Sequence, residues 1–478
     1  MRITRFAVAV ALALPSALAA QQQPGAAAPS RSNINIPLQR YTLPNGLTVI
    51  LSEDHATPMA TVDVWYHVGS KNEVPGRTGF AHMFEHVMFT GSKNVPYGLH
   101  DRLTGGVGGD NNGGTENDRT GYYENVPGNY LESALWMEAD RMGWLLDKLD
   151  ESKFKAQRDI VQNERRQRTD NQPYGRAFEI LTTATYPDSN PYSWPVVGYL
   201  TDLQSATVED VKNFFRLYYA PNNATLAIVG DFDPKQARAW VAKYFGDIPR
   251  GKPIVRPKIA MPKLTSQTHL VYEDRVQVPR LYVQWPTVPE PNGDDAALSM
   301  LGAVISGPRT ARLTKALVYD KQLAASAFAG QNSREGSGEF IAVMTPRPGH
   351  TLTELEAEMD SVIARVKRDG ITAEELARAK AGQEFGFVSG LESNLGKAEI
   401  LASGNAYYND PSHYKKQYAE LTSVTPEDIK RVANKYLTSN RVVLSVVPMG
   451  KTDMASKPEK SGKVTVSADG GHYTLEKK

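Results

Sequence analysis

The sequence contains no cysteine among its 478 residues. Disulfide bonds, thiolate metal ligands and a cysteine nucleophile are therefore excluded. An excess of charge of one sign is also absent, because 54 lysines and arginines stand against 53 aspartates and glutamates. A chain so close to neutral lacks the basic footprint of a nucleic-acid-binding protein, and we expect no nucleic-acid partner. The nine histidines and the carboxylates are then the main candidate metal ligands.

Long apolar runs are lacking beyond the first twenty residues, so we expect no membrane span in the processed chain. Residues 1–20 have the order of a signal peptide: Arg2 and Arg5, an apolar run from Phe6 to Ser16, then Ala17-Leu18-Ala19. A membrane anchor is the alternative, but the run is short for the about 20 residues that a span needs. We therefore expect a soluble, secreted protein, which is periplasmic if its source is a Gram-negative bacterium.

Composition divides the rest of the chain into two large parts with loose ends. Residues 21–35, rich in Gln, Ala, Pro and Ser, are expected to form a disordered leader, and residues 456–478, rich in Lys, Ser and Gly, a flexible tail. A linker is expected at residues 251–268, within a stretch that contains Pro249, Pro253, Pro257 and Pro262. The remaining ranges are an N-terminal domain of residues 36–250 and a C-terminal domain of residues 269–455.

These two domains repeat each other. The stretch that begins Thr207-Val208-Glu209-Asp210 and runs on to Val229 matches the one that begins Thr425-Pro426-Glu427-Asp428 and runs on to Val447, at a constant offset. Each copy predicts a helix with a threonine N-cap, followed by an apolar strand. Upstream, Pro58 precedes a predicted strand at residues 61–68, and Pro279 precedes one at residues 281–288. The pattern predicts an α+β fold of two homologous α/β-sandwich halves, made by internal duplication.

The segment from Gly79 to Phe89 carries the clearest chemical signal. Its apolar residues recur at helical spacing, and His82 and His86, four apart, lie one turn apart on the same helix face. Two imidazoles at this spacing can bind one zinc ion. Glu85 points to the same side, where it can reach a metal-bound water. A helix whose polar face happens to carry these three residues is the alternative.

A catalytic zinc site needs a third protein ligand and an open position. Residues 154–167 are predicted to form a helix, in which Glu164 lies close to the apolar face with Ile160 and Val161. A carboxylate near a core needs a partner, and zinc would be one. An ion pair of Glu164 with Arg165 or Arg166 is the alternative.

His82-x-x-Glu85-His86, followed by Glu164 in Val161-Gln162-Asn163-Glu164-Arg165-Arg166, resembles the pitrilysin/insulinase family of zinc metallopeptidases, the inverzincins, and in particular its processing-peptidase-like branch. The likeness extends from Tyr41 to Val447 and includes residues 136–142 and 220–223. It implies one Zn²⁺ per chain, held by His82, His86 and Glu164, with Glu85 as general base. It also implies that the chain forms half of a clamshell.

The resemblance further implies a substrate role for residues 105–127, where we expect Asn112, Thr115, Tyr122 and Tyr123 to contact substrate. Residues 120–126 are predicted to form a strand, to which a peptide can add as a further strand. An ordinary flexible loop is the alternative.

The second half departs from the metal motif. The offset between Pro58 and Pro279 puts Ala303, Ser306 and Gly307 opposite the zinc helix and the Glu164 position near Gly386, so we expect one metal site and a C-terminal half that only lines the chamber. Gln157 stands where relatives commonly have a glutamate that supports the metal ligands, and an amide would support them less strongly.

Many active relatives also supply an arginine and a tyrosine from the C-terminal half. Here Arg309 and Arg312 lie near a predicted turn and Tyr319 in the following helix, and the sequence assigns that role to none of them.

These observations predict a secreted zinc metalloendopeptidase that hydrolyses peptides or unfolded polypeptides, with Glu85 as general base. Because the chain supplies two repeats where full clamshell relatives have four, we expect a homodimer, or a heterodimer with a related chain that lacks the zinc motif. The alternatives are a zinc-bearing subunit that is inactive without its partner, a non-catalytic peptide-binding subunit, and a metal hydrolase of small molecules.

Overall fold

The computed structural model describes residues 34–467 and 472–476. The described residues from Ile36 onward form one compact unit. The expected signal peptide of residues 1–20 lies outside the described residues, as does the expected leader of residues 21–35 apart from its last two positions. Within the part of the chain that the structure describes, no helix is both long and apolar enough to cross a bilayer.

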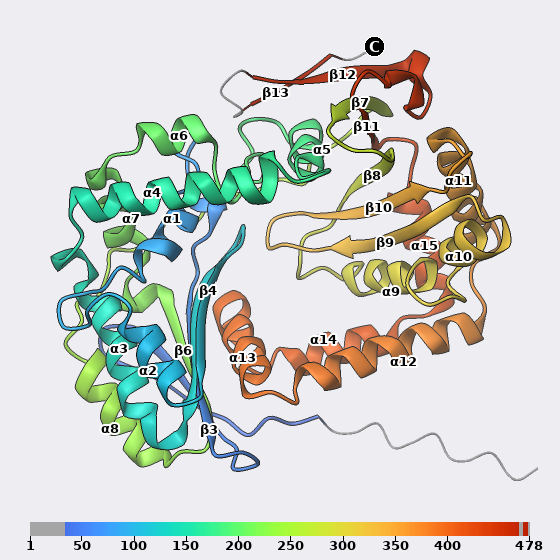
Figure 1. Cartoon of the computed structure of the whole chain (residues 1–478). Helices are drawn as coiled ribbons and strands as arrows, with labels where there is room; N and C mark the ends of the chain where they lie inside the picture. Colours follow the sequence, from blue (N-terminus) through green and yellow to red (C-terminus); the bar gives the residue numbers. More distant parts are fainter. Residues whose placement is uncertain (1–33, 468–471, 477–478) are drawn as a thin grey trace, which may run out of the picture. The chain divides into compact units, whose positions relative to one another are not determined.

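The first half contains a six-stranded sheet in the order β1-β2-β6-β3-β5-β4. Figure 1 labels β3, β4 and β6 of this sheet. The strands are β1 (Gln39–Thr42), β2 (Thr48–Glu53), β3 (Met59–Tyr66), β4 (Asp110–Thr115), β5 (Thr120–Pro127) and β6 (Ala224–Gly230). β2 and β6 are parallel, and the other neighbours are antiparallel. β4 is an edge strand, so one side of its backbone is open to a further strand.

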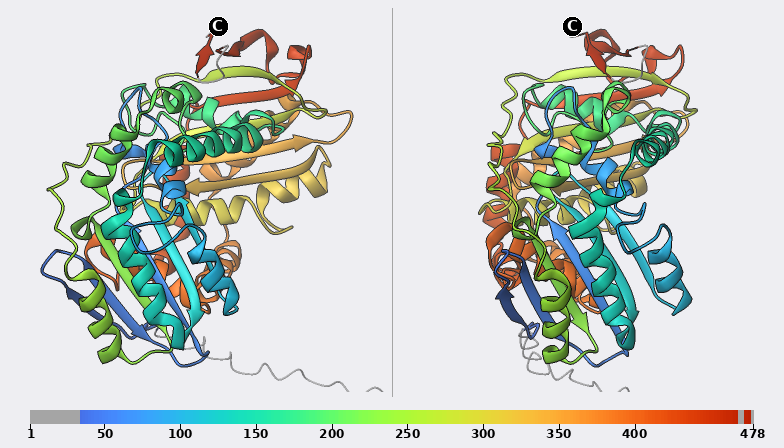
Figure 2. Two further views of the ribbon diagram at one scale, coloured as in Figure 1. Left: turned by 60° about the vertical axis from the view of Figure 1, so that its left-hand side comes forward. Right: turned by 90° about the vertical axis from the view of Figure 1, so that its left-hand side faces the viewer.

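Helices cover this sheet. They are α1 (Phe80–Val87), α2 (Leu99–Gly106), α3 (Leu131–Trp144), α4 (Glu151–Arg165), α5 (Ala177–Thr185), α6 (Leu200–Ser205), α7 (Val208–Tyr218) and α8 (Pro234–Phe245). Val62, Val64 and Tyr66 alternate along β3 toward the side of the sheet where Phe84 of α1 packs, and they form one buried core. Figure 2 shows from two further directions how the helices of this half lie against its strands.

The second half repeats the sheet. Its order is β13-β12-β7-β11-β8-β10-β9, in which β7-β11-β8-β10-β9 has the arrangement of β2-β6-β3-β5-β4, including the one parallel pair at its start. The strands are β7 (Thr268–Asp274), β8 (Arg280–Thr287), β9 (Ala324–Asn332), β10 (Gly338–Pro346), β11 (Val442–Pro448), β12 (Ser461–Val466) and β13 (Tyr473–Leu475). The predicted duplication and α+β fold class are confirmed.

The helices of the second half follow the same sequence of elements. They are α9 (Asp295–Ile305), α10 (Arg312–Thr314), α11 (Leu352–Asp369), α12 (Ala373–Gly390), α13 (Asn394–Tyr408), α14 (Tyr414–Ser423) and α15 (Pro426–Tyr436). The repeated threonines act as predicted: Thr207 caps α7 and Thr425 caps α15, each in a capping box with an aspartate three residues later.

Each half contributes one helix to the sheet of the other. α13, from the second half, packs on β3 and β6, and Asn405 donates a hydrogen bond of 2.8 Å to Thr225 of β6. In return α5, from the first half, packs on β8 and β11, where Ile180 and Leu181 share a core with Leu444. The two predicted domains are therefore interlocked within one unit, and their boundaries stay a prediction. No helix or strand occurs in residues 246–267, all of which are described.

The prediction that residues 456–478 form a flexible tail is wrong for most of the described residues in that range. β12 pairs in parallel with β7 and antiparallel with β13. Val464 and Tyr473 are buried in the core that α5 completes. The Lys, Ser and Gly content suggested a loose segment, but the alternation of Val464 and Val466 with polar residues suits a strand that covers an open sheet edge.

Candidate metal centre

α1 presents the predicted metal-binding residues from a firmly packed position. It begins after Gly79, whose φ of +86° is left-handed and whose Cα approaches Gly198 so closely that a Cβ would lie 2.6 Å from the Val197 carbonyl oxygen. Phe80, Phe84 and Val87 are buried in the first core. The opposite side of this short helix carries His82 and His86, whose ring centroids lie 4.8 Å apart.

Glu73 holds the start of this helix, a role that the sequence analysis missed. Its carboxyl accepts hydrogen bonds from the backbone N–H groups of Gly79, at 2.9 Å, and Ala81, at 2.8 Å. Burial raises the pKa of this carboxyl well above its usual range, against the lowering effect of these donors. Helix N-terminal N–H groups need such an acceptor. No local pattern reveals it, because Glu73 precedes the helix by several residues and a turn lies between them.

Glu164 reaches both histidines from α4, which packs against α1. Its Oε2 lies 3.0 Å from His86 Nε2 and 3.8 Å from His82 Nε2. Its Oε1 lies 2.6 Å from the exposed Arg168 guanidinium. Arg165, which the sequence offered as an alternative partner, instead binds Glu179 and the Gly198 carbonyl oxygen, and Arg166 binds Asn163.

The donor set fits a zinc ion. Two ligands of a tetrahedral zinc with bonds of about 2.0–2.1 Å lie about 3.3 Å apart. The 3.0 and 3.8 Å separations of Glu164 Oε2 from the two Nε2 atoms lie on either side of that value. The 3.0 Å approach to His86 does not have hydrogen-bond geometry, as expected for two lone pairs directed at a common point. Two imidazoles and one carboxylate are a set that zinc accepts.

Burial sets the protonation of the site. It lowers the pKa of His82 to about 4, aided by the neighbouring His86, so His82 is neutral and able to bind a metal at neutral pH. Burial also raises the pKa of Glu85. Ligand atoms of His82, Glu85 and His86 all lie within 4.8 Å of one another, so the Glu85 carboxyl is close enough to reach a water on the same ion. The buried His82 Nδ1 has no hydrogen-bond partner.

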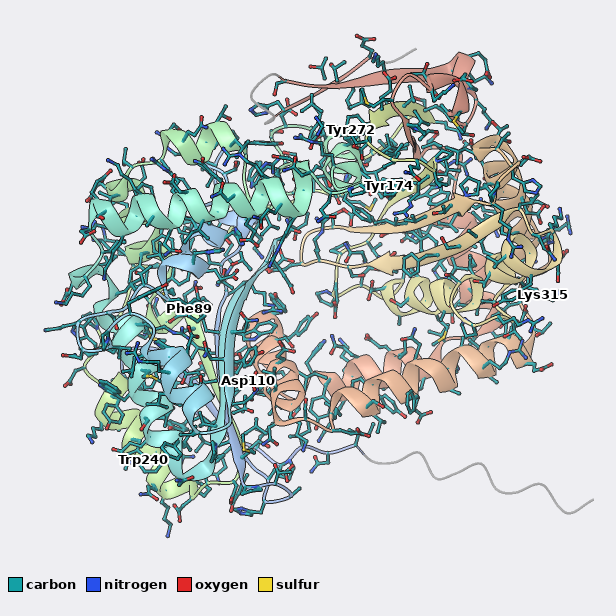
Figure 3. All side chains as sticks on the ribbon, in the orientation of Figure 1. Phe89, Asp110, Tyr174, Trp240, Tyr272 and Lys315 are labelled. Atoms are coloured by element: carbon teal, nitrogen blue, oxygen red, sulfur yellow. The ribbon has the colours of Figure 1, made fainter. Side chains whose placement is uncertain are left out.

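The edge strand β4 passes directly over Glu85. A Cβ on Gly113 would lie 3.2 Å from Glu85 Cγ and 3.1 Å from the rings of Phe89 and Tyr122, so glycine allows this close approach. Thr115, two residues further along β4, lies near the Glu85 carboxyl and lowers its pKa, although its hydroxyl forms no regular hydrogen bond. Figure 3 labels Asp110, where β4 starts, and Phe89, just after α1.

The strand that can accept a peptide is therefore β4 and not residues 120–126. The predicted strand exists as β5, but it pairs with β3 on one side and β4 on the other, which leaves no free edge. The prediction that Tyr122 contacts substrate is also wrong. Its side chain is fully buried, between the Arg141 guanidinium and the ring of Tyr66, and cannot contact a substrate. The sequence analysis missed β4 because its glycines suggested a loop.

The other expected substrate residues are accessible. Asn112 is exposed on β4, and Thr115 and Tyr123 are half-buried. Their contact with substrate stays a prediction. Gln157 lies on α4 before Glu164, but it forms no hydrogen bond with the described metal-site residues, and its supporting role also stays a prediction.

In the described part of the second half, the residues predicted to correspond to the metal-binding helix line a cavity. Ala303, Ser306 and Gly307 line a cavity of about 520 Å³ between the end of α9, β9 and α12. Gly386 lies on α12 as expected but faces a different cavity, and Gly382, one turn earlier, is the glycine beside Ala303. Glu164 and Gly386 lie equally far from the caps of their helices, Asp150 of α4 and Thr372 of α12, which agrees with the predicted alignment.

The candidate arginines and tyrosine of the second half already have partners within that half. Arg312 donates two hydrogen bonds of 2.7 Å to Glu375 of α12. Arg309 lies over the Tyr319 ring, 4.6 Å from its centroid. Among the described residues, no hydrogen bond, ion pair or ring contact joins either pair to α1.

A second buried group, His100, Glu124 and Glu138, also has metal-ligating side chains close together. The Arg141 guanidinium lies in the same place and donates to Glu138 at 2.8 Å. Burial raises the pKa of Glu124 to about 8 and that of Glu138 to about 7. A fixed positive charge beside two carboxyls whose pKa values are raised does not suit a metal cation, and we assign no ion to this group.

Comparisons with known proteins agree with this geometry. Residues 48–194 match the family model described as insulinase (peptidase family M16), and residues 205–383 match the model described as peptidase M16 inactive domain. Zinc protease PqqE of Helicobacter pylori is 32% identical over 405 residues, which cover 83% of this chain and 90% of that protein. Subunit beta of the mitochondrial-processing peptidase of Saccharomyces cerevisiae is 24% identical, and the alignment covers 86% and 90% of the two chains.

Solved structures of similar proteins share this fold. A protease from Helicobacter pylori superposes with a TM-score of 0.81 at 29% identity, over 86% of this chain and all of the other. A peptidase M16 inactive domain from Pseudomonas fluorescens superposes with a TM-score of 0.76 at 21% identity, over 86% and 98% of the two chains, which indicates a common fold.

Proposed function

Because this chain belongs to the insulinase family of zinc peptidases (peptidase family M16), we propose that it is a zinc metalloendopeptidase acting on peptides or unfolded polypeptides. The observation that carries the proposal is the convergence of Glu164 Oε2 on His86 and His82, with Glu85 beside them under the free edge of β4. A metal-binding set next to an open strand edge suits hydrolysis of an extended peptide.

In this proposal His82, His86 and Glu164 hold one zinc ion, which would polarise the scissile carbonyl and lower the pKa of a water. Glu85 takes the proton of the attacking water and delivers it to the leaving amine. The N–H and C=O groups on the open side of β4 align the peptide main chain. Such pairing accepts many side chains and requires an extended segment, so folded proteins are poor substrates.

A second candidate is a zinc-bearing subunit that is inactive without a partner chain. The engagement of Arg312 with Glu375, and of Tyr319 with Arg309, favours it, because the chain then offers neither pair to a substrate carbonyl at α1. The partner would be a second copy or a related chain without the zinc motif. A non-catalytic peptide-binding subunit is a third candidate, and the complete metal-binding set argues against it.

We also propose that the chain is exported by its first twenty residues and acts outside the cytoplasm, in the periplasm of a Gram-negative source. Mass spectrometry of the protein purified from its native cell would test this. A mature N-terminus close to residue 21 is expected, and an intact Met1 would contradict export by cleavage.

The decisive experiment is hydrolysis of a quenched-fluorescence peptide library by zinc-loaded protein, with Glu85→Gln as the matched variant. We expect the variant to keep its zinc but to turn over peptide more slowly by a factor of about 10²–10⁴, because a general base contributes a factor of that order. Ser306→Ala, at the corresponding end of α9, is the control and should retain full turnover.

If neither the wild type nor the variant cleaves any peptide, while each chain binds one zinc, the single-chain peptidase is wrong. Light scattering and co-purification would then be used to find the subunit that completes the site. If peptide binding is retained without turnover in every assembly, the non-catalytic candidate is favoured.

A further inference from the structure

The C-terminal hairpin, formed by β12 and β13, belongs to the second half but contacts the first half near the metal centre. β13 is the outermost strand of the second sheet and contacts α5. Tyr473 of β13 is only 9% exposed and shares a core with Ile180 and Leu181 of α5. In Figure 1 β13 lies next to α5, near the end of α4. The end of the chain therefore packs against a neighbour of the helix that carries Glu164.

Hydrogen bonds connect this hairpin to the end of α4. The Tyr473 hydroxyl donates to Glu179 of α5. The Glu179 carboxylate also accepts from both terminal nitrogens of Arg165, at 2.9 and 3.0 Å. Arg165 is fully buried and is the last residue of α4, directly after Glu164. Tyr473 is thus linked to the residue next to the proposed zinc ligand.

Glu164 lies in the last turn of α4, where a side-chain anchor has most influence. Residues Arg166–Asp170 continue the helix as a wider π-helical turn. Because the backbone hydrogen-bond pattern changes at this point, the rotation of the last turn depends on its side-chain contacts. Successive side chains of a helix point about 100° apart, so Arg165 can be anchored at α5 while Glu164 faces α1.

Arg165 also holds the segment against which α1 begins. It donates to the Gly198 carbonyl oxygen at 3.0 Å. Gly198 packs against Gly79, the residue before α1, so closely that a Cβ on Gly198 would lie 2.4 Å from Gly79 Cα. The next residue, Tyr199, donates its backbone N–H to the Thr78 hydroxyl at 2.9 Å. One guanidinium therefore joins the end of α4 to the start of α1.

A second residue of the hairpin contacts the same segment. The ring centroid of His472 lies 4.3 Å from that of Tyr199, the residue after Gly198. Tyr473, the next residue of the hairpin, binds Glu179. The two acceptors of the α4 guanidinium are thus each supported from the hairpin, Glu179 directly and Gly198 through its neighbour.

The ion pair between Arg165 and Glu179 depends on such support because it is buried. The Arg165 side chain has no exposed surface, and that of Glu179 is 11% exposed. Asp170 lies further from the guanidinium, at 3.7 Å. A buried ion pair is stable only where hydrogen bonds also satisfy its remaining polar atoms. The Tyr473 hydroxyl supplies one of them to the Glu179 carboxylate.

We propose that the C-terminal hairpin supports the metal centre and that Tyr473 is a positioning residue for Glu164. It acts through the ion pair of Glu179 with Arg165 and touches neither substrate nor zinc. The inference rests on the proposed function for the zinc site itself. It predicts that removal of one hydroxyl in the second half weakens zinc binding in the first.

The first test compares two tyrosine-to-phenylalanine variants. Tyr473→Phe removes the hydroxyl that binds Glu179. Tyr436→Phe is the matched control, since the Tyr436 hydroxyl of α15 donates to another carboxylate of the second half, Asp294, at 2.6 Å. Competition with a chromogenic chelator measures zinc affinity, and urea unfolding of the zinc-free protein measures stability.

We expect Tyr473→Phe to weaken zinc binding by about fivefold, a factor that corresponds to the loss of one hydrogen bond. Tyr436→Phe should lose similar stability and keep the zinc affinity of the wild type. An unchanged zinc affinity in Tyr473→Phe would overturn the inference. An equal loss in both variants would overturn it too, because it would indicate general destabilisation.

These results are distinguishable from a failure of the proposed function. If the inference is overturned while the wild type cleaves peptides, the proposed function stands. If zinc affinity falls only in Tyr473→Phe, while no form of the protein cleaves any peptide, the peptidase proposal is contradicted and the positioning role of Tyr473 stands.

The second test determines whether Tyr473 acts through Glu179. Zinc affinity is measured for Glu179→Gln alone and combined with Tyr473→Phe. The double variant should bind zinc no more weakly than Glu179→Gln, because the effects of residues in one hydrogen-bond network do not add. Fold-losses that multiply in the double variant would mean that Tyr473 acts independently of Glu179 and would overturn the inference.

Discussion

The two halves of this protein use the same framework for different purposes. The strand order β2-β6-β3-β5-β4 recurs as β7-β11-β8-β10-β9, and a capped helix precedes the central strand in both halves. In the first half α1 brings His82, Glu85 and His86 to Glu164 of α4. The corresponding end of α9 brings Ala303 and Ser306 to a cavity beside Gly382. The framework therefore does not require the metal site.

The two halves also differ in the direction in which the pKa values of their buried carboxyl groups are shifted. In the first half Glu124 and Glu138 share the single Arg141 guanidinium, and burial raises the pKa of both carboxyls. In the second half Glu356 of α11 is hydrogen-bonded by His269, Arg441 and Lys457, which together hold its pKa far below the usual range despite its burial. Where donors are sufficient a buried carboxylate stays ionised, and where they are scarce it retains a proton.

The largest expected effect concerns zinc. We expect His86→Ala to abolish stoichiometric zinc binding, measured by elemental analysis after gel filtration, because two protein ligands hold zinc much less tightly than three. His350→Ala, remote from α1, is the control and should retain one zinc per chain. Zinc retained at full stoichiometry in His86→Ala would mean that the second half, or the His100 group, is the metal site.

Removing the charge of Glu356 should destabilise the protein by about 3–5 kcal/mol at pH 7, because it leaves His269, Arg441 and Lys457 around a neutral amide. Chemical unfolding of Glu356→Gln measures it. The Glu356 carboxyl has a lowered pKa in the folded state, so its contribution is present above about pH 4.5 and is lost as the pH falls. The variant should approach the wild type in acid. A constant difference at all pH values would contradict the ionised state of Glu356.

Glu73→Gln should cost about 1–3 kcal/mol of stability, because one of the two carboxyl oxygens that accept from the Gly79 and Ala81 N–H groups is replaced by an NH₂ group, which cannot accept. Zinc affinity should fall with it, since the cap orients α1. Competition with a chromogenic chelator measures the affinity. Asp294→Asn is the comparison in the second half: Asp294 precedes α9 but binds Arg431, Lys435 and Tyr436 instead. Asp294→Asn should therefore leave zinc affinity unchanged.

The smallest effect is the pH dependence of the first-half carboxyl pair. Burial raises the folded-state pKa of Glu124 to about 8 and that of Glu138 to about 7, both above the ordinary glutamate pKa of about 4.5, so folding binds protons and stability falls as the pH rises through this range. Glu124→Gln should reduce the loss of stability between pH 6 and pH 9, which is measured as a smaller decrease in the urea midpoint of unfolding. An unchanged shift would mean that Glu124 is ionised in the folded protein.

Much of the fold could be predicted because it depends on local patterns. The alternation along β3, the helical spacing around Phe84, and the threonine caps of α7 and α15 each follow from a few neighbouring residues. β4 could not be found in this way, because its glycines weaken any strand signal. It forms because β5 offers a free edge, and its glycines allow the chain to pass over Glu85. The ordered tail was missed for a related reason, since β12 depends on pairing with β7.

Sequence alone determined the duplication, the His82-Glu85-His86 motif and the family resemblance, because residue type and spacing are sufficient for them. The tertiary structure decided how these parts meet. It brought Glu164 to the two histidines, put Glu73 at the start of α1, buried Tyr122, and exchanged α5 and α13 between the sheets. Such contacts depend on the packing of remote surfaces, and no local spacing encodes that packing.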